Sequence, residues 1–549
     1  MKVAMVTMEV HGGRCEENFA YMMKQIQRAR ADHADLIVFP QDCISGAYWG
    51  DSLQNEDYCR YLDQFNERLI QESMDLAIAW GNLRYRSHQR FHCAFFAYQG
   101  ETYMRVKKKS HLPFFREDSF QELGINRAIS LHDEVLALNF GSDIQLADWN
   151  INIDARPFDI HEAMELHGNV IYVNAVGMQN EGKAVVMMEG GSAIYREGKC
   201  LWQQPYGEAG YALIDTDVNL EQAKQPRKLA ALLAGAIRGF DQQILGGKCP
   251  WIVGLSGGLD SSVSAALLTY ALGKDRVIGY GMSSENNSHA TKNNARQLAS
   301  ALEIEYHEGS ILPLVETTKI TLASYGYDQV EGLTLENIQA RLRGHLLSSF
   351  ASLHGGVVVN NGNKVENALG YCTMYGDAIG ALGILGDLTK VQLFNLSSEL
   401  NQIFKKPVIP ENLLPQCEHG QIHFEVAPSA ELRYDQVDPM KWFYHDYLVD
   451  HLGRDLTLHQ FLRGYLDGSL MQGELRDIML FYGLDDPECF LTDLNWFLAT
   501  AQRNMFKHTQ VPAILTVSRN GYALRHEIQG FDERESLQEL MAGVSAMKK

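Results

Sequence analysis

Two patterns of hydrophobic and polar residues alternate along the chain. Short apolar runs suited to buried strands recur, and the longer stretches between them carry apolar residues at helical spacing. The clearest apolar runs lie at 36–39, 170–173, 251–253, 277–280 and 357–359. Such alternation predicts an α/β fold, in which helices cover sheets. After about Trp442 the pattern changes to short helical pieces rich in aromatic and acidic residues, which we interpret as a C-terminal extension packed on the second domain.

A polar, proline-containing stretch at 217–227 marks the expected boundary between two domains. It leads into 228–237, an apolar run with helical character. At roughly 150 residues per domain, a chain of 549 residues has room for three or four domains, or for two large ones. We therefore predict domains at 1–217 and 228–549, the second including the C-terminal extension.

Composition narrows the possible partners. The chain holds 48 Lys and Arg against 68 Asp and Glu, a formal net charge of −20, so we expect no nucleic-acid partner. No run reaches the roughly 18 apolar residues of a membrane span, and the start of the chain lacks the apolar core of a signal peptide. The nine cysteines form no Cys-x-x-Cys pair, which argues against a disulfide framework or a zinc site. We expect a cytoplasmic protein without a membrane partner.

The segment 251–262 carries the strongest chemical signal. A strand-like run ends in Ser-Gly-Gly and a helical run follows, so backbone N–H groups and the positive end of the helix dipole converge on one point. Glycines leave room for a phosphate, and serines add hydroxyl donors. The expected anion contacts are Ser256, Gly257, Gly258, Ser261 and Ser262. The alternative is a capped strand-to-helix turn without a ligand, but Asp260 and the paired serines favour the functional interpretation.

Ser256-Gly-Gly-Leu-Asp-Ser261 resembles the signature of the PP-loop ATP pyrophosphatases. These enzymes split ATP between the α and β phosphates to adenylate a carboxylate or amide, and they include NAD, GMP and asparagine synthetases and tRNA-modifying enzymes. Three later stretches, at 336–343, 362–377 and 428–438, are similar to NAD synthetases in particular. The similarity covers most of 228–525 and implies a Rossmann-like fold for this domain.

This resemblance implies a role for each charged residue that it covers. Expelling pyrophosphate builds negative charge, which calls for a divalent cation and fixed positive charges. The implied carboxylates near Mg²⁺ are Asp260 and Glu366, and the implied basic contacts to the nucleotides are Lys364, Lys390 and Arg341. Asp377 matches a position at the pyridine-nucleotide substrate. We expect Asp260, Lys364 and Lys390 to act in catalysis, with ATP and Mg²⁺ as cofactors.

The chain departs from the family pattern in three places, and these leave the acceptor acid open. Asn361 stands where threonine is usual, and Val365 stands where serine is frequent. The loop at 422–427 lacks a lysine often found there, and the segment 282–288 lacks the usual proline and tyrosine.

Residues 1–217 resemble the nitrilase-like glutaminase domain of glutamine-dependent NAD synthetases, an α/β sandwich. The stretches 34–40, 109–113, 172–179 and 190–192 carry this similarity. An active domain uses a Glu base, a Lys and a nucleophilic Cys. Here Lys109 is present, Gln41 stands at the base position, and no cysteine occurs between Cys93 and Cys200, although we expect the nucleophile region at 143–150. Because Cys43 and Cys200 would each need a different geometry, we expect no glutaminase activity.

The sequence therefore predicts an ammonia-dependent ligase of NAD synthetase type that converts nicotinate adenine dinucleotide to NAD, and we expect a homo-oligomer. A related ligase acting on nicotinate mononucleotide or a secondary-metabolite acid is an alternative. A nucleotide-binding scaffold without catalysis is another, although Asp260, Glu366, Lys364 and Lys390 argue against it. The sequence leaves open whether ammonia arrives free or from a partner.

Overall fold

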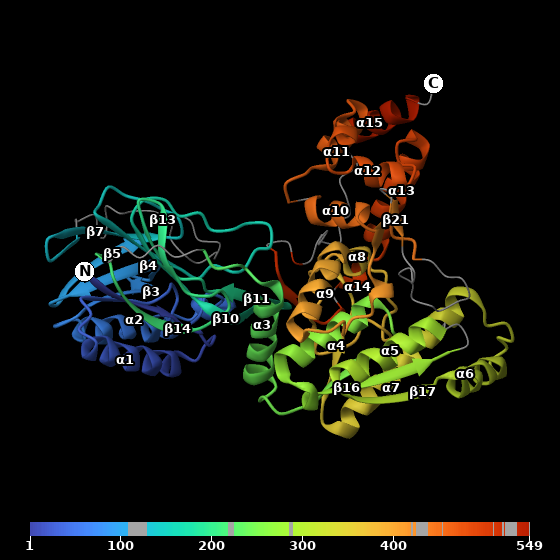
Figure 1. Ribbon diagram of the computed structural model, residues 1–549, viewed down its shortest axis with the longest axis horizontal. Helices are drawn as coiled ribbons and strands as arrows, with labels where there is room; N and C mark the ends of the chain where they lie inside the picture. The colour runs from blue at the N-terminus through green and yellow to red at the C-terminus, as the bar shows by residue number, and fades with distance from the viewer. Residues whose placement is uncertain are drawn as a thin grey trace. The chain divides into compact units, whose positions relative to one another are not determined.

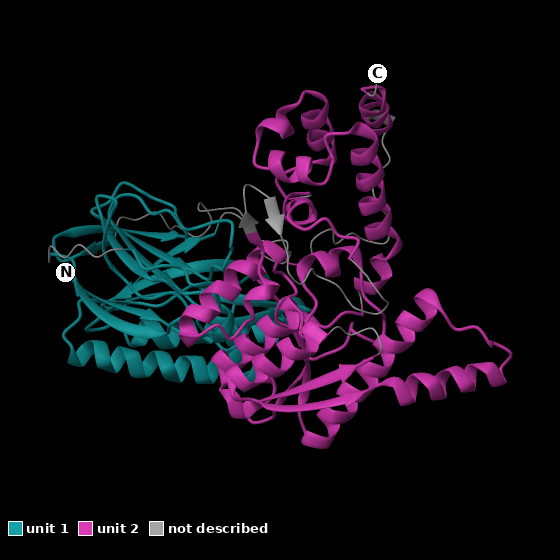
Figure 2. Ribbon diagram, turned by 45° about the vertical axis from the view of Figure 1, so that its right-hand side comes forward, with its two compact units in different colours: residues 1–243 teal, residues 244–549 magenta. Residues whose placement is uncertain are grey.

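The computed structural model describes residues 1–107, 129–217, 224–284, 289–418, 421–423, 438–452, 454–508, 510–518, 521 and 535–547. The chain forms two compact units, residues 1–243 and 244–549, which Figure 2 colours separately. The boundary lies at the last residue of helix α3 (Leu229–Ile244), whereas the polar stretch at 217–227 indicated a boundary before this helix. The reason is packing, because a Cβ at Gly239 of α3 would lie 2.9 Å from Met178 Cγ of the first unit.

Two six-stranded sheets form the first unit. The first has the order β14-β1-β2-β3-β4-β5, with strands β1 (Lys2–Thr7), β2 (Leu36–Val38), β3 (Ala77–Arg86), β4 (Gln89–Tyr98), β5 (Glu101–Val106) and β14 (Gly210–Asp215). The second has the order β13-β12-β9-β8-β7-β6, with strands β6 (Ile129–Leu131), β7 (Glu134–Phe140), β8 (Trp149–Asp154), β9 (Val170–Asn174), β12 (Ala193–Arg196) and β13 (Lys199–Gln203). Strands β10 (Val176–Glu181) and β11 (Ala184–Glu189) pair antiparallel.

Alternation along β1 explains the layering of the first unit. Val3 and Met5 belong to a core that includes residues of both sheets, so the sheets pack face to face. Ala4 and Val6 point to the other side of the sheet, into a core shared with helices α1 (Cys15–Ala31) and α2 (Glu56–Gln71). A short 3₁₀ helix, η1 (Gly50–Gln54), precedes α2. Because both faces of β1 are buried, its sequence is apolar almost throughout.

The second unit is built on parallel strands in the order β22-β19-β18-β15-β16-β17. Their bounds are β15 (Trp251–Gly254), β16 (Val277–Ser283), β17 (Glu305–Ser310), β18 (Val357–Asn360), β19 (Leu382–Gly383) and β22 (Ala513–Thr516). The chain runs from β15 outward to β17 and then returns to the other side of β15 with β18. Strand β15 is thus the point where strand order reverses, and ligands of such sheets bind beyond the carboxyl ends of the strands there.

Helices flank this sheet and form a separate C-terminal layer (Figure 1). Those associated with the sheet are α4 (Leu259–Leu272), α5 (His289–Leu302), α6 (Leu312–Ser324), α7 (Gly332–His354), α8 (Lys364–Leu369) and α9 (Lys390–Phe404). The C-terminal helices are α10 (Tyr444–His451), α11 (Leu458–Leu466), α12 (Arg476–Phe481), α13 (Pro487–Arg503), α14 (Met505–His508) and α15 (Glu535–Ala546). Short elements complete the unit: η2 (Lys274–Arg276), η3 (Glu411–Leu413), η4 (Ser469–Gln472), β20 (Gln416–Glu418) and β21 (Gln421–His423).

The C-terminal helices share one apolar core with α8, which contributes Val365, Ala368 and Leu369. Val365 is fully buried there, so the departure from serine at this position has a packing reason. The predicted α/β fold is confirmed. Among the described helices, none combines the length and the hydropathy of a membrane span.

Candidate active site

The loop between β15 and α4 has a shape that requires glycine. Gly257 has a φ of +83°, and a Cβ there would lie 1.9 Å from the carbonyl oxygen of Thr291 in α5. Gly258 is the N-cap of α4, and its N–H donates to Ser256 Oγ at 3.2 Å. The first turn of α4 therefore begins directly at the end of the central strand, with its free backbone N–H groups at the place that the sequence predicted.

The three predicted serines differ in what their hydroxyls do. Ser262 Oγ donates to the carbonyl oxygen of Gly258 at 2.8 Å, and Ser261 Oγ donates to the same oxygen at 3.2 Å. Both side chains are buried, whereas Ser256 is exposed. Ser261 and Ser262 thus hold the loop in shape, and Ser256 is the hydroxyl that a ligand can reach.

Two carboxylates from distant parts of the chain meet beside this loop. Asp260 lies in the first turn of α4, and Asn363, the N-cap of α8, donates from Nδ2 to Asp260 Oδ2 at 3.2 Å. The backbone N–H of Asn363 donates to Glu366 Oε2 at 3.2 Å, which completes a capping box. Burial raises the pKa of the Glu366 carboxyl to about 8, and the Asp260 carboxylate adds to the rise. Asn363, which sequence reasoning did not single out, therefore brings the two acids together.

Lys390 supplies the positive charge of this site. Its Nζ lies 2.8 Å from each oxygen of Asp260 and 4.5 Å from the centre of the Trp442 ring. Burial acts to lower the pKa of Lys390, but the carboxylates of Asp260 and Glu366 outweigh it, so the pKa is raised. The ammonium thus stays charged although the side chain is 3% exposed.

Lys364, also predicted to contact the nucleotides, has a different environment. Its Nζ lies 2.7 Å from Asp450 Oδ1, 2.9 Å from Asp387 Oδ1 and 3.2 Å from Ser518 Oγ. An ammonium has three N–H donors, and these acceptors use all of them. The side chain is 2% exposed. Lys364 therefore joins α8 and α10 to the loop after β22, and we leave it out of the proposed nucleotide contacts.

The remaining predicted residues meet at the turn that follows α8. Thr373 Oγ1 donates to Asn337 Oδ1 at 2.8 Å, and Arg341 Nε donates to the carbonyl oxygen of Met374 at 3.3 Å. Asp377 Oδ1 accepts from the backbone N–H of Thr373 at 2.5 Å, so in this structure Asp377 shapes the turn. The stretches 336–343 and 362–377 are thus brought into contact, while 428–437 lies outside the described residues.

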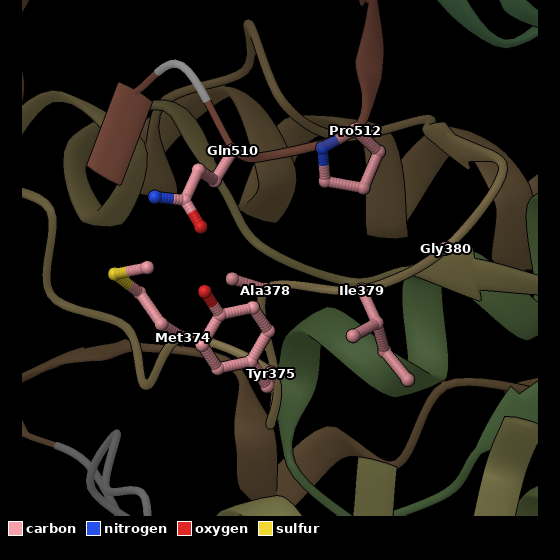
Figure 3. A pocket seen from close by; sticks show the side chains of 7 residues that line it. All are labelled: Met374, Tyr375, Ala378, Ile379, Gly380, Gln510 and Pro512. Atoms are coloured by element: carbon pink, nitrogen blue, oxygen red, sulfur yellow. The ribbon is translucent and has the colours of Figure 1, made fainter. Parts of the chain in front are cut away.

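This turn forms one wall of a pocket of about 260 Å³ (Figure 3). Its lining residues are Met374, Tyr375, Ala378, Ile379, Gly380, Gln510 and Pro512. The lining is mostly apolar, and the Tyr375 hydroxyl and the Gln510 amide are its polar side-chain groups, as Figure 3 shows. A planar aromatic ring with a polar edge suits a lining of this kind.

The position corresponding to a nitrilase-type base lies after β2 in the first unit. The Gln41 side chain is 1% exposed, and its Nε2 donates to Asp42 Oδ1 at 3.0 Å and to the carbonyl oxygen of Cys93 at 3.4 Å. His92 Nε2 lies 2.8 Å from the same Asp42 oxygen. Burial raises the pKa of the Cys43 thiol far above its ordinary value, and this thiol donates to the carbonyl oxygen of Gly81 at 3.5 Å. The Gln41 amide cannot act as a base, and the buried thiol of Cys43 does not have the form of an activated nucleophile.

The residue that lies against Gln41 from the second sheet is Asp154, at the carboxyl end of β8. The backbone N–H of Gln41 donates to the carbonyl oxygen of Asp154 at 3.1 Å. The segment 143–150, where we expected the nucleophile region, comprises the loop before β8 and the first two residues of that strand, and it holds no cysteine. Lys109, the third predicted residue of a nitrilase-type site, lies outside the described residues.

Known proteins are similar in sequence to this chain over both of its units. The family model described as NAD synthase matches residues 247–454. The glutamine-dependent NAD(+) synthetase of Acinetobacter baylyi is 27% identical over 80% of this chain and 84% of its own length. The NH(3)-dependent NAD(+) synthetase of Thermoplasma acidophilum is 32% identical over 38% of this chain and 84% of its own length.

Two solved structures show the same fold over nearly the whole chain. The glutamine-dependent NAD(+) synthetase of Cytophaga hutchinsonii has a TM-score of 0.73 at 13% identity, with 99% of each chain covered. That of Acinetobacter baumannii, in complex with ADP, has a TM-score of 0.66 at 21% identity and covers 97% of this chain and 99% of its own. With its phosphate loop, its paired carboxylates and a nitrilase-like unit ahead of them, the chain belongs to the NAD synthetase family, in its two-domain form.

Proposed function

We propose that the protein is an ATP-dependent amide ligase that converts nicotinate adenine dinucleotide to NAD with free ammonia. The observation that carries this proposal is the cluster of Asp260, Glu366 and Lys390 beside a glycine loop at the reversal point of the sheet. First, a carboxylate oxygen of the acceptor attacks the α-phosphorus of ATP, and the bond to the bridging oxygen breaks to release pyrophosphate. Ammonia then attacks the acyl carbon, loses a proton and displaces AMP.

The residues of the loop supply fixed positive potential for this chemistry. The N–H groups at the start of α4 and the Ser256 hydroxyl face the position of a phosphate, and they need no reorganisation as charge develops. Lys390 provides a full positive charge near the same point. We assign Lys390 to the leaving pyrophosphate, since its ammonium is held beside the first turn of α4.

Asp260 and Glu366 are the residues that would hold Mg²⁺. Within the described residues no group of three or more His, Cys, Asp or Glu side chains could hold a metal alone. Magnesium bound with a nucleotide needs only one or two carboxylates, because phosphate oxygens and water complete its shell. Two close carboxylates, one with a raised pKa, fit such a site since a cation relieves their repulsion. When bound, the metal would neutralise charge on the pyrophosphate.

The pocket at Tyr375 and Gln510 is our candidate site for the acceptor ring. Its wall belongs to the turn in which Asp377 caps Thr373, the segment that resembles the pyridine-nucleotide contact of the family. Of the departures from the family pattern, the one at Asn361 lies within the described residues beside the phosphate loop, whereas 285–288 and 424–427 lie outside them. Asn361 Nδ2 donates to the carbonyl oxygen of Gly254 at 3.1 Å, at the start of the phosphate loop.

The nitrogen source is proposed to be ammonia because we expect no catalytic thiol in the first unit. A glutaminase of nitrilase type needs a thiolate and a base to generate it. Gln41 is an amide that cannot ionise, and the Cys43 thiol is buried and bonded to a backbone carbonyl. The relatives' names include both glutamine-dependent and ammonia-dependent enzymes, so the donor must be tested on this chain.

The test measures products with ATP, Mg²⁺ and a panel of pyridine carboxylates, with ammonium or ammonia-free glutamine as the nitrogen donor. We expect AMP, pyrophosphate and NAD with ammonium, and no amide with glutamine. Amide formed only from another acid in the panel would identify the alternative ligase. Efficient use of glutamine would overturn the assignment of the first unit, and absence of pyrophosphate release with every acid would favour the nucleotide-binding scaffold.

We also propose that the protein forms a homo-oligomer through α6 and the start of α7. Within α6, Val315 is the buried residue, and large side chains that follow it are exposed by about two thirds or more: Ile320 71%, Tyr325 77%, Tyr327 67% and Leu333 72%. Figure 2 shows this helical arm projecting from the rest of the second unit. Large apolar side chains exposed close together in sequence on one helical arm favour a protein interface there. Light scattering that finds only a 61.8 kDa monomer would contradict it.

A further inference from the structure

Lys390 is held from two sides by a segment that lies outside every motif of the phosphate site. Trp442 places its ring centre 4.5 Å from Lys390 Nζ, and both side chains are almost fully buried. Asp446, four residues later, accepts hydrogen bonds from the backbone N–H groups of Lys390 and Val391. The second Asp446 oxygen accepts from the N–H of Phe443 at 2.6 Å. The segment 442–446 therefore fixes both the start of α9 and the end of the lysine side chain.

The ring and the carboxylate give the ammonium two different kinds of partner. Asp260 offers a full negative charge through both of its oxygens, each 2.8 Å from Nζ. Trp442 offers the negative face of its indole, an attraction that strengthens when water is excluded. Asp260 is also a carboxylate that we assign to Mg²⁺, so its pairing with the lysine has to change when substrates bind. The indole is neutral and is not assigned to the metal, so its contact with the ammonium can persist when substrates bind.

We propose that Trp442 is a positioning residue, which keeps the Lys390 ammonium in place while Asp260 exchanges partners. The identity of the reaction comes from the proposed function, on which this inference rests. The pairing of Trp442 with Lys390 comes from the geometry alone. It predicts that the π face matters more than the volume of the side chain. Phenylalanine at 442 should therefore substitute far better than leucine.

The test compares W442F and W442L in the full chain, with W496L as the matched control. Trp496 belongs to the same C-terminal layer, but its ring stacks on His445, with ring centres 5.5 Å apart. Binding of Mg²⁺ with α,β-methylene ATP is measured by calorimetry, and pyrophosphate release gives kcat and KM. We expect W442L to weaken nucleotide binding and lower kcat by about tenfold, W442F to stay within about threefold, and W496L to match the wild type. The KM of the acceptor should change little.

A second variant separates positioning from packing. In a K390M background the ammonium is absent, so W442L should weaken nucleotide binding no further than K390M does alone. Equal losses for W442F and W442L, or an undiminished effect of W442L in the K390M background, would overturn the assignment. Thermal unfolding of each variant confirms that the compared proteins are folded.

The binding measurement also separates this inference from the proposed function. Wild-type protein that binds the analogue but releases no pyrophosphate with any acceptor would overturn the function and leave the binding comparison valid. Wild-type protein that does not bind the analogue would overturn both.

Discussion

The polar residues beyond the carboxyl ends of β15 and β2 differ in their exposure to solvent. After β15, Asp260 and Lys390 form an ion pair in which the carboxylate side chain is 18% exposed, so that substrates can reach it. After β2, Gln41 and Asp42 are 1% and 2% exposed and bond inward to Cys93 and His92. Both are dense polar networks near a strand end. The difference indicates that substrates can change the partners of the first network, as we propose for catalysis, whereas the second network is closed and we expect it to stabilise the fold.

The largest expected effect concerns Lys364, which should behave as a structural residue although it lies in a catalytic motif. Lys364→Met would leave Asp387 and Asp450 buried without their cation, at a cost of about 3–5 kcal/mol in the free energy of unfolding. Denaturant unfolding measures this cost. The control is Lys319→Met, because the surface pair of Lys319 with Glu316 should contribute below about 1 kcal/mol. A stable K364M protein that fails only in nucleotide binding would show that the sequence motif was the better guide.

Asp260 should behave in the opposite way, with the loss falling on turnover. Asp260→Asn removes the carboxylate from both Lys390 and the proposed metal, and we expect pyrophosphate release to fall about 100- to 1000-fold. Steady-state kinetics measures it, and Asp275→Asn at the exposed 3₁₀ turn after α4 is the control. Wild-type turnover in D260N would show that Asp260 does not act in catalysis and that the site of the second unit is wrongly assigned.

Glu366 sharpens the comparison through pH. Its pKa is raised from 4.5 to about 8 in the folded protein, so its contribution to stability is complete below pH 4.5 and is lost as the pH rises through 8. Glu366→Gln keeps the shape of the neutral acid, and without metal its Tm should exceed that of the wild type by a few degrees near pH 9 and converge with it near pH 5. Glu303→Gln, at a surface pair with Lys274, provides the control. Parallel curves for wild type and E366Q would contradict the raised pKa.

The smallest expected effect is in the first unit. Cys43→Ala should leave the rate of amide formation with ammonium unchanged. It should also leave the rate with glutamine unchanged, because the Cys43 thiol is protonated and bonded to the carbonyl oxygen of Gly81. The measurement is amide formation with each nitrogen donor, with Cys200→Ala run beside it. If either substitution abolished a glutamine-dependent rate, the network after β2 would be a working site.

The sequence predicts what is encoded locally. Strand, glycine turn and helix are neighbours in the chain at 251–272, so the phosphate loop and the α/β fold could be predicted from their spacing. The partners of the two lysines could not. Lys364 meets Asp450, 86 residues later, and the backbone of Lys390 meets Asp446, 56 residues later. A motif shows that a lysine is present, but only the fold decides which carboxylates surround it.

The unit boundary and Val365 teach the same lesson. The polar stretch before α3 resembles a linker, but the face of α3 that carries Gly239 determines the unit to which the helix belongs. Val365 departs from the family pattern in sequence, yet it lies in the core shared by α8 and the C-terminal helices. Burial on one side of a short helix cannot be read from a six-residue segment such as α8.

The buried carboxylate of Asp387 sets a lower limit on how far the chain can be shortened. It accepts from the backbone N–H groups of Val517 at 2.6 Å and Ser518 at 2.8 Å, just after β22, which is itself paired with β19. A chain ended at residue 454, where the match to the family model stops, would lose this strand and these donors while keeping every predicted catalytic residue. Anyone expressing the second unit alone should therefore extend it at least through residue 518, because the residues that perform the chemistry are a smaller set than those that make it foldable.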